Sequence, residues 1–149
     1  MNKVNINLMH INTGNGRFKL TEKAVLNMII DNNASISGIS ESNAEVEKPL
    51  TMAKRKRLFK GFTIEDKVWD GYPLARFSFV ISNKITYKRR KDLENTTNPL
   101  IVLEVKRSNK RKVYIVGCYR QWRGKSPQCL YNLYKMTIKS NVYRIFSTL

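Results

Sequence analysis

The sequence has few acidic residues, few cysteines and a single histidine. Asp and Glu number 11 against 28 Lys and Arg, so the 149 residues carry a formal net charge of +17. With two cysteines and one histidine, His10, the chain lacks the roughly four Cys and His ligands of a structural zinc site. A metal ion bound here would therefore be a hard cation on carboxylate oxygens, such as Mg²⁺.

Long apolar runs are also missing. No apolar stretch reaches the ~18 residues that a membrane-spanning helix needs. The first residues alternate apolar side chains with Asn, which does not match a secretory signal peptide. We therefore expect an intracellular protein, not secreted, with reduced cysteines and no membrane span. The positive charge favours a polyanionic partner, with nucleic acid first and an anionic membrane surface second.

What is present predicts one α/β domain of the α+β kind. Hydrophobic residues make up 42% of the chain, enough for a core. Residues 4–11 alternate like a strand, Thr21 can cap a helix to about Asn32, and a second strand follows at 35–40. Residues 41–49 are polar and loop-like. A short basic helix and five closely spaced, mostly antiparallel strands are then expected, at residues 51–59, 62–68, 75–82, 86–89, 100–106 and 112–118, the last two forming a hairpin.

The composition changes near residue 125. Ser126 and Pro127 form a typical helix start, and apolar residues recur at helical spacing as far as Phe146. We therefore divide the chain into residues 1–125 and an amphipathic helical tail at 126–149.

Basic residues gather in three runs, at 54–57, 88–91 and 106–112. Each run can contact phosphates, and binding through them would depend strongly on salt. Solvated charge on turns and strand ends explains any single run about as well, and the first run also resembles a nuclear signal.

Two further features allow a functional and a structural interpretation. Glu41 directly follows the strand at 35–40, where it could hold a divalent cation, although an exposed loop position is the more common case. His10 is interpreted as a half-buried strand residue, because no nucleophile pattern accompanies it. Residues 119–122 combine aromatic rings, a cation and an amide, which suits stacking on bases or packing in a core.

Four segments, in this order, resemble a known family: residues 8–12 (LMHIN), 39–43 (ISESN), 75–94 and 116–122 (VGCYRQW). They resemble the N-terminal part of the endonuclease/exonuclease/phosphatase superfamily. Within it, the sequence is most similar to the apurinic-endonuclease-like domain of non-LTR retrotransposon endonuclease–reverse transcriptase proteins. The resemblance implies a partial four-layer β-sandwich with flanking helices, whose active site lies at the top of the sandwich.

The resemblance also implies Mg²⁺-assisted hydrolysis of phosphodiester bonds in DNA, as in retrotransposon target-site nicking. Glu41 matches the metal-binding glutamate, Asn12 the asparagine that supports the metal and phosphate site, and Tyr119 the tyrosine that hydrogen-bonds the scissile phosphate. Contacts to nucleic acid are expected in or beside the matched motifs, at Arg17, Asn43, Arg76, Arg89, Arg90, Arg120 and Gln121.

The chain departs from the family in its second half. The family uses a later Asp-x-Asn motif and a terminal Asp-His pair, whereas no Asp follows Asp92 and the one His is His10. We therefore expect a truncated domain that is impaired alone, and another chain could supply or cover the missing half. The alternative is a non-catalytic, basic nucleic-acid-binding or ribonucleoprotein assembly subunit. DNA is favoured over RNA, and the nucleus over the cytoplasm.

Overall fold

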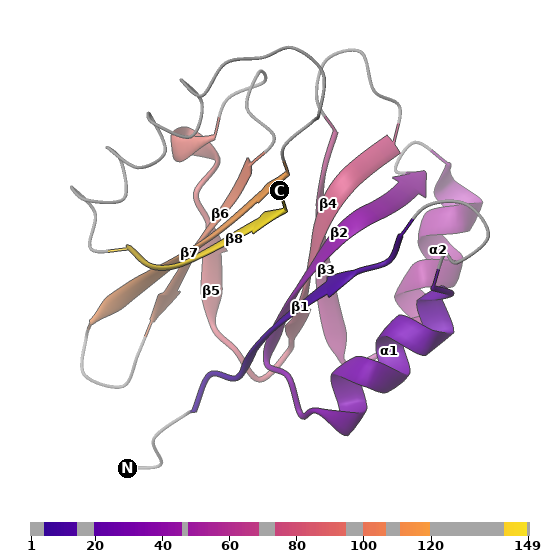
Figure 1. Cartoon of the computed structure of the whole chain (residues 1–149), viewed down its shortest axis with the longest axis horizontal. Coiled ribbons are helices and arrows are strands. Elements are labelled where there is room, and N and C mark those ends of the chain that lie inside the picture. Colours follow the sequence, from indigo (N-terminus) through magenta and orange to yellow (C-terminus); the bar gives the residue numbers. More distant parts are fainter. Residues whose placement is uncertain are drawn as a thin grey trace.

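Two four-stranded β-sheets face each other, and two helices cover the outer face of one of them (Figure 1). The computed structural model describes residues 5–14, 20–45, 48–68, 74–94, 100–106, 111–119 and 142–148; for Tyr119 and the last range it describes only the backbone. The first sheet and its helices comprise β1 (Leu8–Asn12), α1 (Glu22–Asp31), β2 (Ile36–Glu45), α2 (Pro49–Leu58), β3 (Phe62–Lys67) and β4 (Leu74–Ser82). The second sheet and a short 3₁₀ helix comprise β5 (Tyr87–Arg89), η2 (Lys91–Leu93), β6 (Leu100–Lys106), β7 (Lys112–Tyr119) and β8 (Val142–Thr148).

The strand order is β1-β2-β4-β3 in the first sheet and β5-β6-β7-β8 in the second. β1 and β2 are parallel because α1 connects them, and β2, β4 and β3 are antiparallel. The predicted hairpin is confirmed, since β6 and β7 pair antiparallel from Leu100 to Lys106. The predicted cap of α1 is also confirmed, because the hydroxyl of Thr21 accepts a hydrogen bond from the amide of Ala24 at 3.1 Å.

The main core lies between the two sheets. Its buried side chains alternate along the strands, as the period of two requires: Ile36, Phe77, Phe79, Ile81, Ile101, Leu103, Val105 and Ile115. A second cluster packs α1 against the outer face of the first sheet through Val25, Ile29, Ile39 and Val80. The fold class is therefore the expected one, an α+β sandwich with flanking helices.

One glycine brings the sheets close together. A Cβ atom at Gly117 of β7 would lie 2.1 Å from Cε1 of Phe77 and 2.8 Å from Cζ of Phe79, both in β4. Any larger side chain at this position would force the aromatic rings to move. This contact fixes the end of β7 against the middle of β4.

Two sequence predictions are wrong. β2 continues to Glu45, where a loop was expected, because a bulge lets the strand resume its pairing with β4. Residues 142–148 form β8, parallel to β7, where the C-terminal part of a helix was expected. β-Branched and aromatic residues in this segment suit a strand, and the open edge of β7 supplies the hydrogen-bonding partners. Residues 126–141 of the predicted helix lie outside the described residues.

None of the described helices is long and apolar enough to cross a membrane.

Candidate metal and phosphodiester site

β2 is interrupted by a bulge at its carboxyl end. Regular pairing with β4 stops after Ser40 and resumes at Ala44. Within this interval the three residues 41–43 of β2 face the single residue Arg76 of β4. Bulges of this kind redirect side chains and occur often beside active sites. The segment that the sequence resemblance matched therefore departs from regular strand geometry.

The bulge is strained as well as irregular. Glu41 and Asn43 have positive φ angles of 57° and 47°, in the left-handed region. That region is tolerated by Asn but is unusual for Glu, and it costs on the order of 1 kcal/mol or more. Backbone strain of this kind persists where the surrounding structure over-determines the conformation, which happens mainly at functional sites.

The end of β1 is tied to the bulge. Thr13, which is buried and follows Asn12, donates its hydroxyl proton to the carbonyl of Glu41 at 2.8 Å, and its Oγ1 lies 3.2 Å from the carbonyl of Ser40. Its amide also donates to the carbonyl of Ser40 at 3.2 Å. One residue thus holds together the backbones that carry Asn12 and Glu41.

These two side chains fit one particular mode of metal binding. The described residues contain no group of three or more His, Cys, Asp and Glu side chains that could hold a metal, so no all-protein cage is preformed among them. Mg²⁺ instead commonly takes one or two carboxylates, keeps several waters and binds the substrate phosphate. Glu41 is half-exposed and supplies one carboxylate. Oδ1 of Asn12 accepts from the amide of Gly14 at 2.8 Å, which fixes the amide and leaves the second lone pair of that oxygen for a cation.

His10 lies below Asn12 on the same face of β1. Its Nε2 is 2.7 Å from the hydroxyl of Ser40. Partial burial lowers the pKa of the His10 imidazole, so the ring is neutral at pH 7. Ser40 is itself fully buried and therefore cannot attack a substrate.

Tyr119 is the last residue of β7 and pairs through its Cα with Thr148 of β8. It lies two residues beyond Gly117, which packs on Phe77, the partner of Ser40 in the β2–β4 ladder. Figure 1 shows the carboxyl ends of β1, β2, β7 and β8 pointing toward the same end of the sandwich. The backbone of Tyr119 is therefore at the end where Asn12 and Glu41 lie.

The structure separates the predicted nucleic-acid contacts into three groups. Asn43 and Arg76 lie at the bulge, on its two strands, and both are partly exposed. Arg89 and Arg90 lie in the second layer, in β5 and directly after it. Arg17, Arg120 and Gln121 lie outside the described residues.

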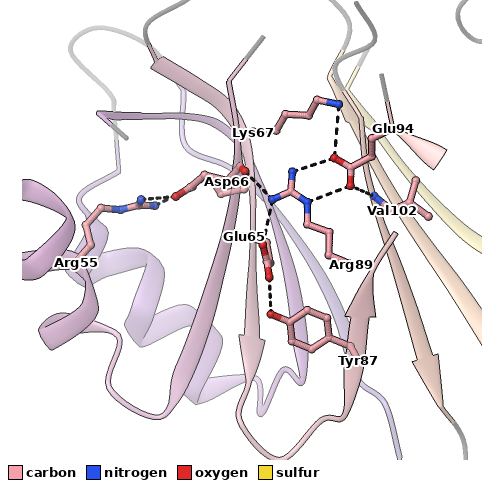
Figure 2. Close-up of polar contacts among 9 residues, drawn as sticks. Arg55, Glu65, Asp66, Lys67, Tyr87, Arg89, Glu94 and Val102 are labelled. Carbon is pink, nitrogen blue, oxygen red and sulfur yellow. Dashed lines mark hydrogen bonds and ion pairs between the residues drawn. The ribbon is translucent and has the colours of Figure 1, made fainter. Parts of the chain in front are cut away.

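Arg89 forms ion pairs within the protein (Figure 2). Its guanidinium donates to both carboxylate oxygens of Glu94, at 3.0 and 2.9 Å, to Glu65 at 3.0 Å, and to the carbonyl of Asp66 at 2.9 Å. The side chain is 14% exposed. Burial opposes the charge on Arg89, but the hydrogen bonds that Arg89 donates to Glu94 and Glu65 outweigh it and raise the pKa of the guanidinium. Arg89 therefore joins the edges of the two sheets, which leaves few donors for a phosphate.

Arg90 is engaged on the outer face of the second sheet. Its guanidinium donates to Asp92 at 2.6 and 2.8 Å and to Glu104 at 2.6 Å, and it lies 5.9 Å from the centre of the Tyr114 ring. A basic run that looks free in the sequence is thus partly neutralised in the fold, and we do not place Arg89 or Arg90 in the interface proposed below.

Comparison with known proteins adds a fold assignment. No family model and no curated protein sequence matches the chain. Among solved structures, it is similar to the endonuclease domain of TRAS1, a telomere-specific non-LTR retrotransposon, with a TM-score of 0.64 and 14% identity over 96% of this chain. The fold is of the endonuclease/exonuclease/phosphatase type. The chain spans 57% of that TRAS1 domain.

Other proteins with this type of fold match less of the chain. Truncated TDP2 from Caenorhabditis elegans has a TM-score of 0.49 and 13% identity, covering 78% of this chain and 49% of that protein. ANGEL2, a 2′,3′-cyclic phosphatase, has a TM-score of 0.49 and 12% identity, covering 75% of this chain and 34% of that protein. At 14% identity, the likeness to the TRAS1 domain concerns the fold alone, and the chemistry depends on the residues present.

Sequence reasoning missed two polar residues that shape this site. The sequence gives no sign of a role for Thr13, and Ser42 stands out only as part of the 39–43 motif, because a hydroxyl side chain produces no periodic signal. It also missed Arg55, which was grouped with three other basic residues. A signal for Arg55 existed, since Met52, Arg55 and Phe59 recur at helical spacing and so share one face of α2.

Proposed function

We propose that this chain binds Mg²⁺ and a DNA phosphodiester as part of an endonuclease, as in target-site nicking by non-LTR retrotransposons. The observation that carries the proposal is the strained bulge of β2, in which the backbone carbonyl of Glu41 accepts a hydrogen bond from Thr13, the residue after Asn12. Because its substrate is DNA, we expect the chain to act in the nucleus. The fold similarity supports a nuclease-like domain, and the net charge of +17 supports a polyanionic substrate.

In this proposal Glu41 and the amide oxygen of Asn12 hold the cation. The cation would stabilise negative charge on the phosphate oxygens and on the leaving oxygen. Tyr119 donates a hydrogen bond to a phosphate oxygen. Asn43 and Arg76 contact the DNA strand beside the bulge, where Arg76 adds a positive charge for the backbone.

The proposed site lacks an evident general base to activate the attacking water among the described residues. No Asp follows Asp92 in the chain, and the imidazole of the single histidine lies against Ser40. Among the described residues no further carboxylate or imidazole is placed at the site to remove a proton, so we expect the loss of general-base catalysis, which is worth about 10²–10⁴-fold. We therefore expect this chain to bind DNA tightly, to hold Mg²⁺ loosely through one carboxylate, and to cleave slowly.

The alternative is a non-catalytic DNA- or RNA-binding subunit. It is favoured by the high positive charge and by the single carboxylate of the described metal site. A binder of this kind needs its basic surface and is indifferent to Glu41.

Nicking of supercoiled plasmid by the purified chain distinguishes the two functions. The reactions contain Mg²⁺ or EDTA, and the variants are Glu41→Gln and, as a charge-matched control, Asp31→Asn at the far end of α1. We expect slow nicking that requires Mg²⁺, is abolished by Glu41→Gln and is unchanged by Asp31→Asn. Absence of nicking, together with salt-sensitive plasmid binding that Glu41→Gln leaves intact, would contradict the proposal and favour the binder.

A further inference from the structure

The bulge lacks packing support on its helix side. A cavity of about 380 Å³ lies between α1, α2 and the first sheet, and Ser42, Asn43, Ser78 and Arg55 are among the residues that line it. Close packing is what normally fixes a buried backbone in one conformation. Beside this cavity, hydrogen bonds must hold the bulge instead.

A chain of hydroxyl groups supplies these hydrogen bonds. The hydroxyl of Ser42, in the middle of the bulge, donates to the carbonyl of Ala75 at 2.9 Å, and its Oγ also lies 2.9 Å from the hydroxyl oxygen of Ser78. The hydroxyl of Ser78 in turn donates to the carboxylate of Asp66. Because a hydroxyl has one proton, Ser78 can only accept from Ser42, whose own proton is then shared between the carbonyl of Ala75 and the hydroxyl oxygen of Ser78 in a three-centre hydrogen bond. The carboxylate of Asp66 thus sets the direction of the whole chain.

Asp66 is itself held from two sides (Figure 2). Its carboxylate accepts from Nη1 and Nη2 of Arg55 at 2.8 and 3.3 Å, and the two side chains are 4% and 6% exposed. Nε of Arg55 also donates to Glu22 at 3.0 Å. On the other side of the sheet, the carbonyl of Asp66 accepts from Arg89 at 2.9 Å. A buried ion pair adds little net stability relative to apolar side chains, so its main effect here is to orient Asp66.

We infer that Asp66, oriented by Arg55, is a positioning residue for the metal site, and that it acts through Ser78 and Ser42 on the bulge that presents Glu41. The inference rests on the proposed function in so far as it concerns metal binding. The residues of the basic run at 54–57 then have different roles. Arg55 is buried and binds Asp66, whereas its basic neighbours on α2 are exposed.

Ser78→Ala tests this inference without disturbing the Arg55–Asp66 pair. The matched control is Ser37→Ala, in the regular part of β2, because the hydroxyl of Ser37 is fully buried and has no hydrogen-bond partner among the described residues. We expect Ser78→Ala to speed amide hydrogen exchange at residues 41–43 about five- to tenfold, the loss expected for one hydrogen bond. Exchange at residues 36–40 should be unchanged, and Ser37→Ala should affect neither segment.

A second readout is the dissociation constant for Mg²⁺, measured by titration. We expect Ser78→Ala to weaken Mg²⁺ binding several-fold, and Ser78→Thr, whose extra methyl group has room in the cavity, to restore it. If Ser78 only stabilised the fold, Mg²⁺ binding would change together with the melting temperature. Recovery of Mg²⁺ binding in Ser78→Thr at an unchanged melting temperature would therefore indicate positioning.

A paired substitution, Arg55→Met with Asp66→Leu, tests Asp66 itself. Apolar replacement of a buried ion pair usually preserves stability, yet it leaves Ser78 without its acceptor. The inference predicts normal melting and fast exchange at residues 41–43.

Unchanged exchange at residues 41–43 in Ser78→Ala would overturn the inference. If wild-type protein does not bind Mg²⁺, the proposed function fails, but the exchange measurement still decides whether the chain from Asp66 positions the bulge.

Discussion

The two halves of β2 are held in place by different forces. From Ile36 to Ser40 the strand pairs regularly with β1 and β4 and is completely buried. From Glu41 to Glu45 it bulges, takes up positive φ angles and borders a cavity. Regular backbone pairing and apolar packing fix the first half, whereas side-chain hydrogen bonds that involve Thr13, Ser42 and Ser78 fix the second half.

This difference shows how one strand can serve as both scaffold and site. In the packed half, many small van der Waals contacts together fix the backbone, so the loss of any one contact leaves its conformation unchanged. The bulged half depends on a few directional contacts, each worth about 1 kcal/mol. Substitutions should therefore act on stability in the first half and on the geometry of Glu41 in the second.

The largest expected effect is in the packed region. Phe77→Ala removes a ring that is 1% exposed and lies between the sheets, and we expect it to lower the free energy of unfolding by about 3–5 kcal/mol. Urea denaturation measures this change. Leu50→Ala, at a position that is 81% exposed, is the control and should change stability by less than about 0.5 kcal/mol. Equal effects of the two substitutions would contradict the assignment of this core.

The next largest effect concerns the contact between the sheets. Gly117→Ala places a methyl group 2.1 Å from the Phe77 ring, and overpacking of this kind costs about 1–3 kcal/mol. Thermal unfolding should show a clear decrease in Tm. The double variant Gly117→Ala with Phe77→Leu should regain part of the loss, because the smaller side chain makes room. Failure of this rescue would mean that the sheets are not in contact at this point.

The strained backbone at Glu41 predicts that two substitutions at this position differ in stability but not in activity. Glu41→Gly should be more stable to unfolding than Glu41→Ala by about 1 kcal/mol, because only glycine adopts the positive φ without a steric cost. Both variants should lose Mg²⁺-dependent nicking, since neither has a carboxylate. If alanine were as stable as glycine in parallel melts, the strain assigned to Glu41 would be wrong.

The smallest effect lies on the outer face of the second sheet. Burial opposes the charge on Glu104, but hydrogen bonds from Arg90 and Lys112 outweigh it and hold the pKa of this carboxyl below its ordinary value. A lowered pKa in the folded state stabilises the protein at neutral pH, and this stabilisation is lost as the pH falls through the folded pKa.

Arg90→Gln removes the main partner of Glu104, so the acid-unfolding midpoint, followed by circular dichroism, should move to a slightly higher pH. Lys84→Gln, which changes an exposed lysine in the turn after β4, is the charge-matched control and should leave the midpoint in place. An unchanged midpoint in Arg90→Gln would contradict the role assigned to Arg90 in holding the pKa of Glu104 low.

The regular elements of this fold could be predicted from local patterns. The cap at Thr21, the strands β3 to β7 and the β6–β7 hairpin all follow from periodicity and turn residues. β8 could not be predicted, because Val142, Ile145 and Phe146 satisfy helical spacing as well. Pairing with the edge of β7, which is a tertiary interaction, favours the strand over the helix.

The candidate site was only partly predictable for a different reason. The resemblance pointed to Asn12, Glu41 and Asn43, but the bulge that carries Glu41 and Asn43 depends on pairing across to Arg76. Arg89 and Arg90 were expected to contact phosphates. Glu94 and Asp92, which bind them, lie nearby in the sequence, but the partners Glu65 and Glu104 are distant in it. Ion pairs between distant residues leave no local pattern, so a basic run alone does not define a surface.

The central claim is that a cation binds at Glu41 and Asn12. Titration with Mn²⁺, a paramagnetic ion that uses the same oxygen ligands as Mg²⁺, tests it directly through broadening of backbone amide signals. The account predicts that residues 12–14 and 40–44 broaden first, that excess Mg²⁺ reverses the broadening, and that Glu41→Gln abolishes it. Broadening that begins elsewhere, or that is the same in Glu41→Gln, would contradict the account.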